Sequence, residues 1–500
     1  MLRGKWSSAT NALLTVLVTV VLGFLLYGAG AATLAVGLAK GAWVGLWILG
    51  VIWPALLLHH LASRVGMSEL GHVLGHLFPR HTQNVLVLAW LLPSAIQGVS
   101  GFGVPIAVAA PLLVAIGVRP VAAVALPLIG YHWSVGFGSM GSSFYMAAFS
   151  ARLDRQQTQE LAHDAAILLG LGCLLAGVLV ALMVGGLRGL REAAPLLVTC
   201  GPVMVVTQFL VARIEPSIGA LSAGVMGLLT ALVVRWVMSR SGAHQRPGVD
   251  DLDPSRAPAA RAAAVPFLAL GVVAVAVMVP PGLRDLVRST ATIAPSFPAT
   301  GGGADGPIPA QVTQTPVHLL AHPGTFLLAA VAIALVVWRW SGFWRPGLIA
   351  DAGRATLKQG RKSSPAIVLL AAVAGAMVDT GMVARLADAV VDSLGHAYLW
   401  AVPALGALGS FVTGSTTNSN ALFSALQVDV AESLGLSPAA VLAGQLAGGN
   451  VGNSVAPVVI LMGLAAVGQS DEVGEVIRRT VLAAAVLLTA TTLASVLVLG

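Results

Sequence analysis

Polar side chains gather in one long interruption of an otherwise apolar chain, between residues 409 and 457. The interruption includes the run TGSTTNSN at residues 413–420, and GGNVGN follows at residues 448–453. Hydrocarbon tolerates glycine-rich, irregular backbone only where protein buries it or where it lines a water-filled cavity. A polar, helix-breaking stretch between apolar spans is therefore a candidate solute-binding site.

A sparser copy of this pattern lies in the first third of the chain. It reads QGVSGFGVP at residues 97–105 and HWSVGFGSMGSS at residues 132–143. Each copy has a Gly-x-x-Pro turn between its two polar parts, at residues 117–120 and 435–438. We interpret each copy as a re-entrant hairpin followed by a broken helix. Paired interruptions of this kind are typical of secondary transporters and indicate where the solute binds.

These interruptions supply hydrogen-bond donors but few charges. Half-helix N-termini carry unpaired N–H groups and the positive end of the helix dipole, so they suit carboxylates. Glycine lets the backbone approach a ligand, although close helix packing and local backbone bonds also use Gly and Ser. The pattern predicts a site for a small polar anion. The candidate substrate-binding residues are Gln97, Gly98, Ser100, Gly101, Phe102, Gly103, Ser415, Thr416, Thr417, Asn418, Ser419, Asn420, Asn450 and Asn453.

Two titratable residues are candidates for proton coupling. Asp379 lies within an apolar span, where an ionisable residue is a functional hypothesis by default, although it could equally cap the segment that follows. His132 opens the first broken segment and its side chain titrates near neutral pH, although a packing histidine fits the pattern as well. His72 and His76 share a helix face, but no third metal ligand is in view. We therefore expect neither a metal nor a cofactor.

Composition limits the class of protein. Of the 500 residues, 57% are hydrophobic and 9% are charged, which is typical of a polytopic membrane protein. The net charge of +7 comes from arginines scattered among short loops, as the positive-inside rule expects, so we predict no nucleic-acid partner. The expected fold is all-α, with about twelve transmembrane helices, two re-entrant hairpins and two repeats that we expect to be inverted.

Two groups of basic residues orient the chain. Two spans separate the loop 241–261 from the basic residues of 339–362, so both groups lie on one side, which the positive-inside rule makes cytoplasmic. The low-complexity segment 281–322 is then a flexible extracytoplasmic loop. The predicted organisation is an N-terminal half, 1–240, with a hairpin at about 97–118 and a broken helix at about 119–145, and a C-terminal half, 262–500, with a hairpin at about 409–435 and a broken helix at about 438–467.

An enzyme of the membrane interior is a remote alternative. Residues 98–101 read GVSG, which matches the Gly-x-Ser-Gly of rhomboid-type intramembrane serine proteases. Such a protease needs a histidine base within reach of Ser100, and His132 is the nearest in sequence. The match covers four common residues and leaves the second polar copy unexplained. We therefore expect a protein that is not an enzyme.

The two longest motifs resemble those of the L-lactate permeases, bacterial transporters of the ion-transporter superfamily. Residues 98–114 read GVSGFGVPIAVAAPLLV, where that family typically has GAAGFGxPVA, and residues 413–427 read TGSTTNSNALFSALQ, where it has TGSDTxSNxLF. Residues 137–141 and 448–452 also fit. The resemblance implies a symporter in the bacterial plasma membrane, which takes up a small 2-hydroxy monocarboxylate such as L-lactate or glycolate together with a proton.

Three positions depart from the family pattern by losing a charge. Gln97 stands where the family usually has a glutamate, Thr416 where it has an aspartate, and Asn453 where it often has a lysine. Because glutamine cannot take up a proton in this range, alternatives stay open: a carrier of the same fold for another small organic or inorganic anion, coupled to Na⁺ or uncoupled, or a channel. The expected partners are the anion, H⁺ or Na⁺, and the lipid bilayer, and a homo-oligomer remains open.

Overall fold

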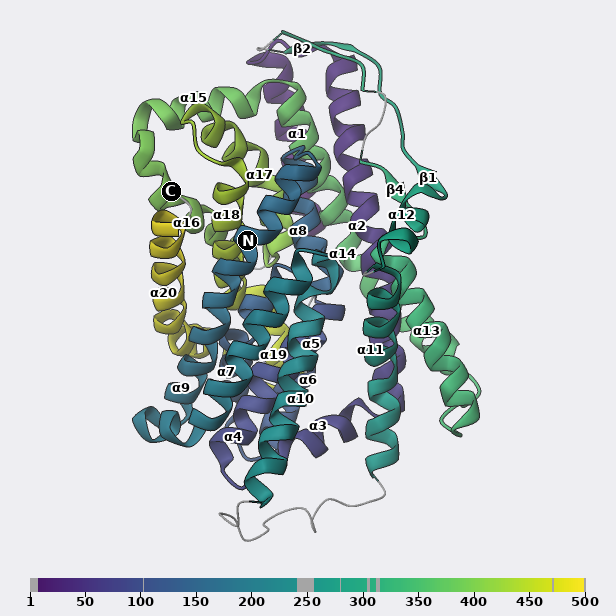
Figure 1. The fold of residues 1–500 in the computed structure, drawn as a ribbon. Helices are drawn as coiled ribbons and strands as arrows, with labels where there is room; N and C mark the ends of the chain where they lie inside the picture. The colour runs from purple at the N-terminus through teal and green to yellow at the C-terminus, as the bar shows by residue number, and fades with distance from the viewer. Residues whose placement is uncertain are drawn as a thin grey trace.

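The chain folds into a bundle of helices, as its composition predicts (Figure 1). Among the described residues, seven helices are long and apolar enough to cross a membrane, or eight if the bent pair Pro438–Ser454 and Pro457–Ala466 is one span. The expected count of about twelve spans is not confirmed, because polar interruptions divide other apolar segments into shorter helices. The computed structural model describes residues 8–101, 103–240, 256–278, 280–303, 306–311, 315–469 and 472–498.

Two groups of elements can be distinguished: those of the polar repeats and those around them. The first repeat comprises α5 (Leu92–Val99), α6 (Val104–Ala115), α7 (Pro120–Gly130), a 3-10 turn (His132–Val135) and α8 (Gly138–Ser150). The second repeat comprises α16 (Tyr398–Thr413), α17 (Thr416–Ser433), α18 (Pro438–Ser454) and α19 (Pro457–Ala466). The surrounding helices are α1 (Ser8–Leu25), α2 (Ala31–Val65), α3 (Met67–Gly75), α4 (His81–Leu86), a π-helical turn (Val87–Leu91), α9 (Arg155–Ala212), a 3-10 turn (Pro216–Ile218), α10 (Gly219–Arg240), α11 (Arg256–Met278), α13 (Pro323–Trp340), α14 (Leu348–Asp379), α15 (Met382–Leu394), a 3-10 turn (Gly395–Ala397) and α20 (Val473–Val498).

Each repeat has the same order of elements: a helix, a break, a second helix, a tight turn and another broken pair. Gly103 and Gly414 lie in the first break of their repeats, with φ of 80° and 71°. Side chains rarely adopt this left-handed conformation, so glycine is the residue that ends one helix and starts the next there at little cost.

The two repeats enter the bundle from opposite ends. In Figure 1, α6 and α7 lie in the lower half of the molecule near α3 and α4, whereas α17 and α18 lie in the upper half near α15. The repeats are therefore inverted, and their breaks meet near the middle of the bundle. The end of α10 and the start of α11, which flank the basic loop of the sequence, lie at the lower end in Figure 1, and the positive-inside rule predicts that this end is cytoplasmic.

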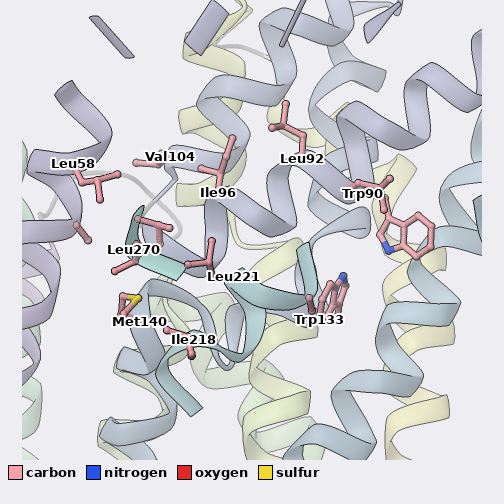
Figure 2. Close-up of a cluster of buried hydrophobic side chains, with 14 of the residues drawn as sticks. Leu58, Trp90, Leu92, Ile96, Val104, Trp133, Met140, Ile218, Leu221 and Leu270 are labelled. Carbon is pink, nitrogen blue, oxygen red and sulfur yellow. The ribbon is translucent and has the colours of Figure 1, made fainter. Parts of the chain in front are cut away.

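The first repeat is held by an apolar cluster. Figure 2 shows Ile96 of α5, Val104 of α6 and Leu221 of α10 within this cluster. Gly98 belongs to the same contact, because a Cβ on it would lie 2.3 Å from the backbone nitrogen of Leu221. Glycine at this position thus permits α5 to pack directly on α10.

Helices α2 and α14 run side by side along most of their length. A Cβ on Gly41 would lie 2.0 Å from the carbonyl oxygen of Ala371, and one on Gly45 would lie 2.7 Å from the Cα of Val368. Small residues let membrane helices approach this closely and gain dispersion contacts. The pair forms a long support beside the repeats.

We expect Gly37→Ala to destabilise the protein by about 1–3 kcal/mol, because its Cβ would lie 2.9 Å from the Cα of Ala376 and the helices would have to separate. Gly353→Ala is the matched control, since nothing lies within 4 Å of a Cβ on that residue of α14. Thermal unfolding of both variants in detergent measures the difference. Equal unfolding temperatures for the two would contradict the close contact.

Helices α14 and α9 can be compared with their sequence-based expectations. Residues 348–379 form one helix, whereas the basic residues up to 362 were expected in a cytoplasmic loop. Pro365 lies inside this helix, and membrane helices accommodate proline because neighbouring groups satisfy the freed backbone. In α9 (Arg155–Ala212), a break at Gly185 and Gly186 separates two helical segments, in agreement with the two spans expected from the sequence, 161–186 and 195–212. The two segments pack against each other, because a Cβ on Gly170 would lie 3.0 Å from Cγ1 of Val205.

The segment 281–322 is partly ordered rather than a loop throughout. It contains a short helix, and its described strands form two small antiparallel pairs, β1 with β4 and β2 with β3. Outside these short strands the described elements are helical, so the expected all-α fold class is confirmed. Residues 241–255 of the basic loop and residues 279, 304–305 and 312–314 lie outside the described part of the chain. The elements are α12 (Pro281–Ser289), β1 (Thr292–Ile293), β2 (Thr300–Gly303), β3 (Gly306–Ile308) and β4 (Val317–His318).

Candidate functional site

A cavity of about 680 Å³ lies where the two inverted repeats meet. Its walls come from α5, α8 and the first break of repeat 1, from the start of α17 and of α19 in repeat 2, and from α1 and α14. Polar groups of both repeats face one space, as the sequence pattern predicts. The lining residues of the repeats include Gln97, Gly103, Tyr131, Ser139, Ser143, Thr413, Gly414, Ser415, Thr416, Thr417, Asn418, Asn453, Val458 and Met462.

Three helices begin at this cavity. Gly103 precedes α6, Ser415 caps α17, and Val458 lies in the first turn of α19. The Ser415 hydroxyl accepts a hydrogen bond from the backbone N–H of Asn418 at 3.3 Å. N-terminal N–H groups and the positive ends of three helix dipoles therefore lie close to the cavity, where they favour a carboxylate.

The wall from repeat 1 is tightly built around Gln97 and Ser139. The backbone N–H of Gly101 donates to the Ser139 hydroxyl at 2.7 Å. A Cβ on Gly101 would lie 2.9 Å from Nε2 of Gln97, so glycine is needed for this approach. Ser139 and Met140 both have positive φ, 48° and 52°. Such strain in residues with side chains persists only where the surroundings enforce it, and it is frequent at binding sites.

The wall from repeat 2 is backed by a chain of buried amides. Tyr398 donates from its hydroxyl to Oε1 of Gln427 at 2.8 Å, and Gln427 donates from Nε2 to Oε1 of Gln445 at 2.9 Å. Gln445 donates from Nε2 to the Ser419 hydroxyl at 3.2 Å and to Oδ1 of Asn420 at 3.5 Å. We call Tyr398, Gln427, Gln445 and Asn420 the amide relay. Each amide in it both accepts and donates, which fixes its orientation.

The relay ends on the opposite repeat. Nδ2 of Asn420 donates to the backbone carbonyl of Ser143 in α8 at 2.9 Å. The Ser143 hydroxyl in turn lies 2.9 Å from the Thr417 hydroxyl. A second bond between the repeats runs from Nδ2 of Asn450 to the carbonyl of Trp133 at 3.2 Å. These contacts connect both walls of the cavity.

The predicted substrate-binding residues divide into two groups. Six of them do not line the cavity, and four of these six, Gly101, Ser419, Asn420 and Asn450, form hydrogen bonds within its walls. The other two are Gly98 and Ser100. Phe102 lies outside the described residues. The three positions that lose a charge relative to the family pattern are all at the cavity. The predicted residues that line it are Gln97, Gly103, Ser415, Thr416, Thr417, Asn418 and Asn453.

Sequence reasoning missed the contribution of α14. Gln359, Arg361 and Lys362 line the cavity. Arg361 and Lys362 are the charged side chains among the described lining residues. They were assigned to a cytoplasmic loop because the segment is basic. Sequence reasoning also missed Gln427 and Gln445, although two glutamines inside apolar helices are a signal of buried hydrogen bonding.

Asp379 lies apart from this cavity, at the end of α14. It is fully buried, accepts a bond from Nζ of Lys40 in α2 at 2.8 Å, and also pairs with Arg152, which follows α8. Lys40 is 2% exposed. A buried carboxylate thus holds two cations from different helices. We call Lys40, Asp379 and Arg152 the ion triad.

His132 is also not among the residues that line the cavity. His132 is buried, and its Nδ1 lies 2.8 Å from the carbonyl of Ile129. The buried Ser100 hydroxyl has no hydrogen-bond partner among the described residues, so the Ser–His pair of a protease is not formed.

Among the described residues, the histidine pair at α3 shows no sign of a metal site. Partial burial is the largest cause that lowers the pKa of His72, and the nearby His76 and Arg256 lower this pKa further. The described residues contain no group of three or more ligands that could hold a metal ion.

Comparisons with known proteins agree with the sequence motifs. A family model described as L-lactate permease matches residues 1–499. The L-lactate permease of Escherichia coli (strain K12) is 26% identical, over 96% of this chain and 90% of its own length, and that of Bacillus subtilis (strain 168) is 25% identical, over 94% and 88%. Among solved structures, the Alcanivorax borkumensis YdaH transporter aligns over 97% of this chain and 95% of its own, with 17% identity and a TM-score of 0.49. The chain belongs to the L-lactate permease family, and it is a multi-pass membrane protein.

Proposed function

We propose that the protein is a secondary carrier of a small 2-hydroxy monocarboxylate such as L-lactate or glycolate. The observation that carries this proposal is the cavity between the inverted repeats, which has three helix N-termini and no carboxylate among its described lining residues. Such a site favours a small anion over a cation. The relatives in Escherichia coli and Bacillus subtilis are named L-lactate permeases, which supports the choice of substrate.

The proposed binding mode uses both repeats. The substrate carboxylate would rest on the N-termini of α6 and α17, where the helix dipoles favour negative charge. The 2-hydroxyl would bond to hydroxyl or amide side chains such as Thr417 and Asn418. A site of neutral donors discriminates against solutes that lack these groups, because its own polar atoms would then be left unpaired.

We propose that a proton accompanies the anion and that Asp379 carries it, with His132 as the other candidate. The ion triad ties α2 and α14 to the end of α8, and so connects the support to the first repeat. A proton on Asp379 would replace these ion pairs and free α8 to move. Gln97, Thr416 and Asn453 offer no proton site in the cavity, so transport without protons is the second candidate.

Counterflow tests the carrier function. Proteoliposomes loaded with unlabelled L-lactate should take up labelled L-lactate transiently above equilibrium, and uptake should saturate. Unlabelled glycolate outside should compete, whereas a neutral amide of lactate should not. A linear, non-saturating flux would indicate a channel and contradict the proposal.

A further inference from the structure

Arg361 and Lys362 lie within a helix rather than in a loop, and both side chains are exposed. Both belong to α14 and line the cavity between the repeats. They follow Asp351, near the basic end of α14, by ten and eleven positions, which is about 15 Å along a helix. The neighbouring Gly360 packs against the ring of Trp53, which lies in the second half of α2. These two cations therefore lie where α14 packs beside α2, and both line the cavity.

Neither cation is neutralised by a carboxylate of the described chain. Arg354, about two turns before Arg361, pairs with Asp351, and both Lys40 and Arg152 pair with Asp379. No ion pair of the described residues includes Arg361 or Lys362. The other described lining residues are formally neutral. Charged side chains that face a cavity between membrane-spanning helices mark substrate pathways.

We propose that Arg361 and Lys362 form a cationic vestibule that receives the substrate carboxylate on the cytoplasmic side of the carrier. The inference rests on the proposed anion transport and names residues that attract and release the anion. A cavity lined by one sign of charge concentrates ions of the opposite sign, by about tenfold or more. The interior of the site binds through neutral donors, so the vestibule supplies its long-range attraction.

The position of the two cations on α14 predicts that the affinity for the anion differs between the two faces of the carrier. The charge of the cavity is on α14, which supports the repeats, and not on the repeats themselves. Movement of the repeats relative to α14 would separate the bound anion from the two cations. Affinity for the anion at the cytoplasmic face therefore depends on Arg361 and Lys362, whereas affinity at the other face does not.

The first test measures the charge of the cavity without any assumption about the substrate. Met462 lines the cavity and is 40% exposed, whereas native Cys173 and Cys200 are buried, so Met462→Cys introduces an accessible thiol. The thiol is treated with the anionic reagent 2-sulfonatoethyl methanethiosulfonate and with its cationic trimethylammonium analogue. The ratio of the anionic to the cationic reaction rate should be higher for this thiol than for a free thiol in solution. Adding Arg361→Gln and Lys362→Gln should lower this anion-to-cation rate ratio about tenfold.

Lys358→Gln is the matched control, because Lys358 is an exposed cation of α14 that does not line the cavity. It should leave the rate ratio unchanged. Equal ratios with and without the double substitution would overturn the vestibule. So would an equal loss in Lys358→Gln, because general surface charge would then be the cause.

The second test measures KM for L-lactate at each face, with inverted vesicles for the cytoplasmic face and proteoliposomes of known orientation for the other. The double substitution should raise the cytoplasmic-face KM about tenfold and remove its dependence on salt, because exposed charges are screened. Arg361→Lys should retain most of the affinity. An unchanged cytoplasmic-face KM would overturn the inference. If the wild type carries no lactate but the Met462→Cys protein shows the expected anion-to-cation rate ratio, the proposed substrate is refuted and the vestibule is retained.

Discussion

Asp379→Asn is expected to destabilise the protein by about 3–5 kcal/mol and to abolish the pH dependence of L-lactate uptake. The substitution leaves Lys40 buried without its carboxylate and next to a second cation, and breaking a buried ion pair from one side costs this much. Loss of the carboxylate also removes the proposed proton carrier. Thermal unfolding in detergent and uptake at several external pH values measure the two effects separately.

The variant Lys40→Met with Asp379→Leu is the control that separates folding from coupling. Replacing a buried ion pair by apolar side chains is often neutral for stability, and Arg152, which is 36% exposed, can still reach solvent. This variant should unfold close to the wild-type temperature and still lack pH-dependent uptake. Retention of pH-dependent uptake by Asp379→Asn would show that Asp379 does not carry the proton.

Gln445→Leu is expected to reduce L-lactate counterflow at least tenfold. The leucine would leave Nε2 of Gln427 and Oδ1 of Asn420 buried without partners, at about 1–3 kcal/mol for each group. Asn420 would then be free to turn away from Ser143, and the two walls of the cavity would lose their connection. The initial rate of counterflow at equal pH on both sides measures the loss.

Gln445→Glu distinguishes positioning from simple packing. A protonated glutamic acid donates one hydrogen bond and can replace the amide, whereas a carboxylate only accepts. Counterflow by this variant should therefore recover as both compartments are acidified, and counterflow by Gln445→Leu should not. Identical pH profiles for the two variants would mean that the relay fills space and does not orient Asn420.

The sequence predicts the polar centre of this protein better than its outer parts. Few structures accommodate irregular polar backbone in a membrane, so the runs of glycine, hydroxyl and amide residues indicate the helix breaks. Residues 319 positions apart in the sequence, Gln97 and Thr416, line one cavity. Which members of a run face the cavity depends on helix rotation, which tertiary packing sets. Gly98, for example, packs on Leu221 of α10 instead of facing the cavity.

Charged residues are where prediction from sequence fails most clearly. Arg361 and Lys362 follow a basic stretch, and a basic stretch beside an apolar span has the pattern of a cytoplasmic loop. Helix α14 nevertheless includes both residues, because its contacts with α2 stabilise helical structure beyond its apolar part. Lys40 stands just before the apolar run 41–63 of the sequence, but α2 begins at Ala31, so this lysine lies inside the helix. Its partner Asp379 is 339 positions away, and no local pattern pairs them.

The central claim, that the protein carries lactate with protons, is tested most directly by uptake of labelled L-lactate into proteoliposomes with and without an imposed inward proton gradient. We predict saturable accumulation above equilibrium that requires the gradient and collapses with a protonophore. Saturable uptake that is indifferent to protons would contradict the coupling. Absence of L-lactate uptake by protein that is folded in the same liposomes would contradict the substrate itself.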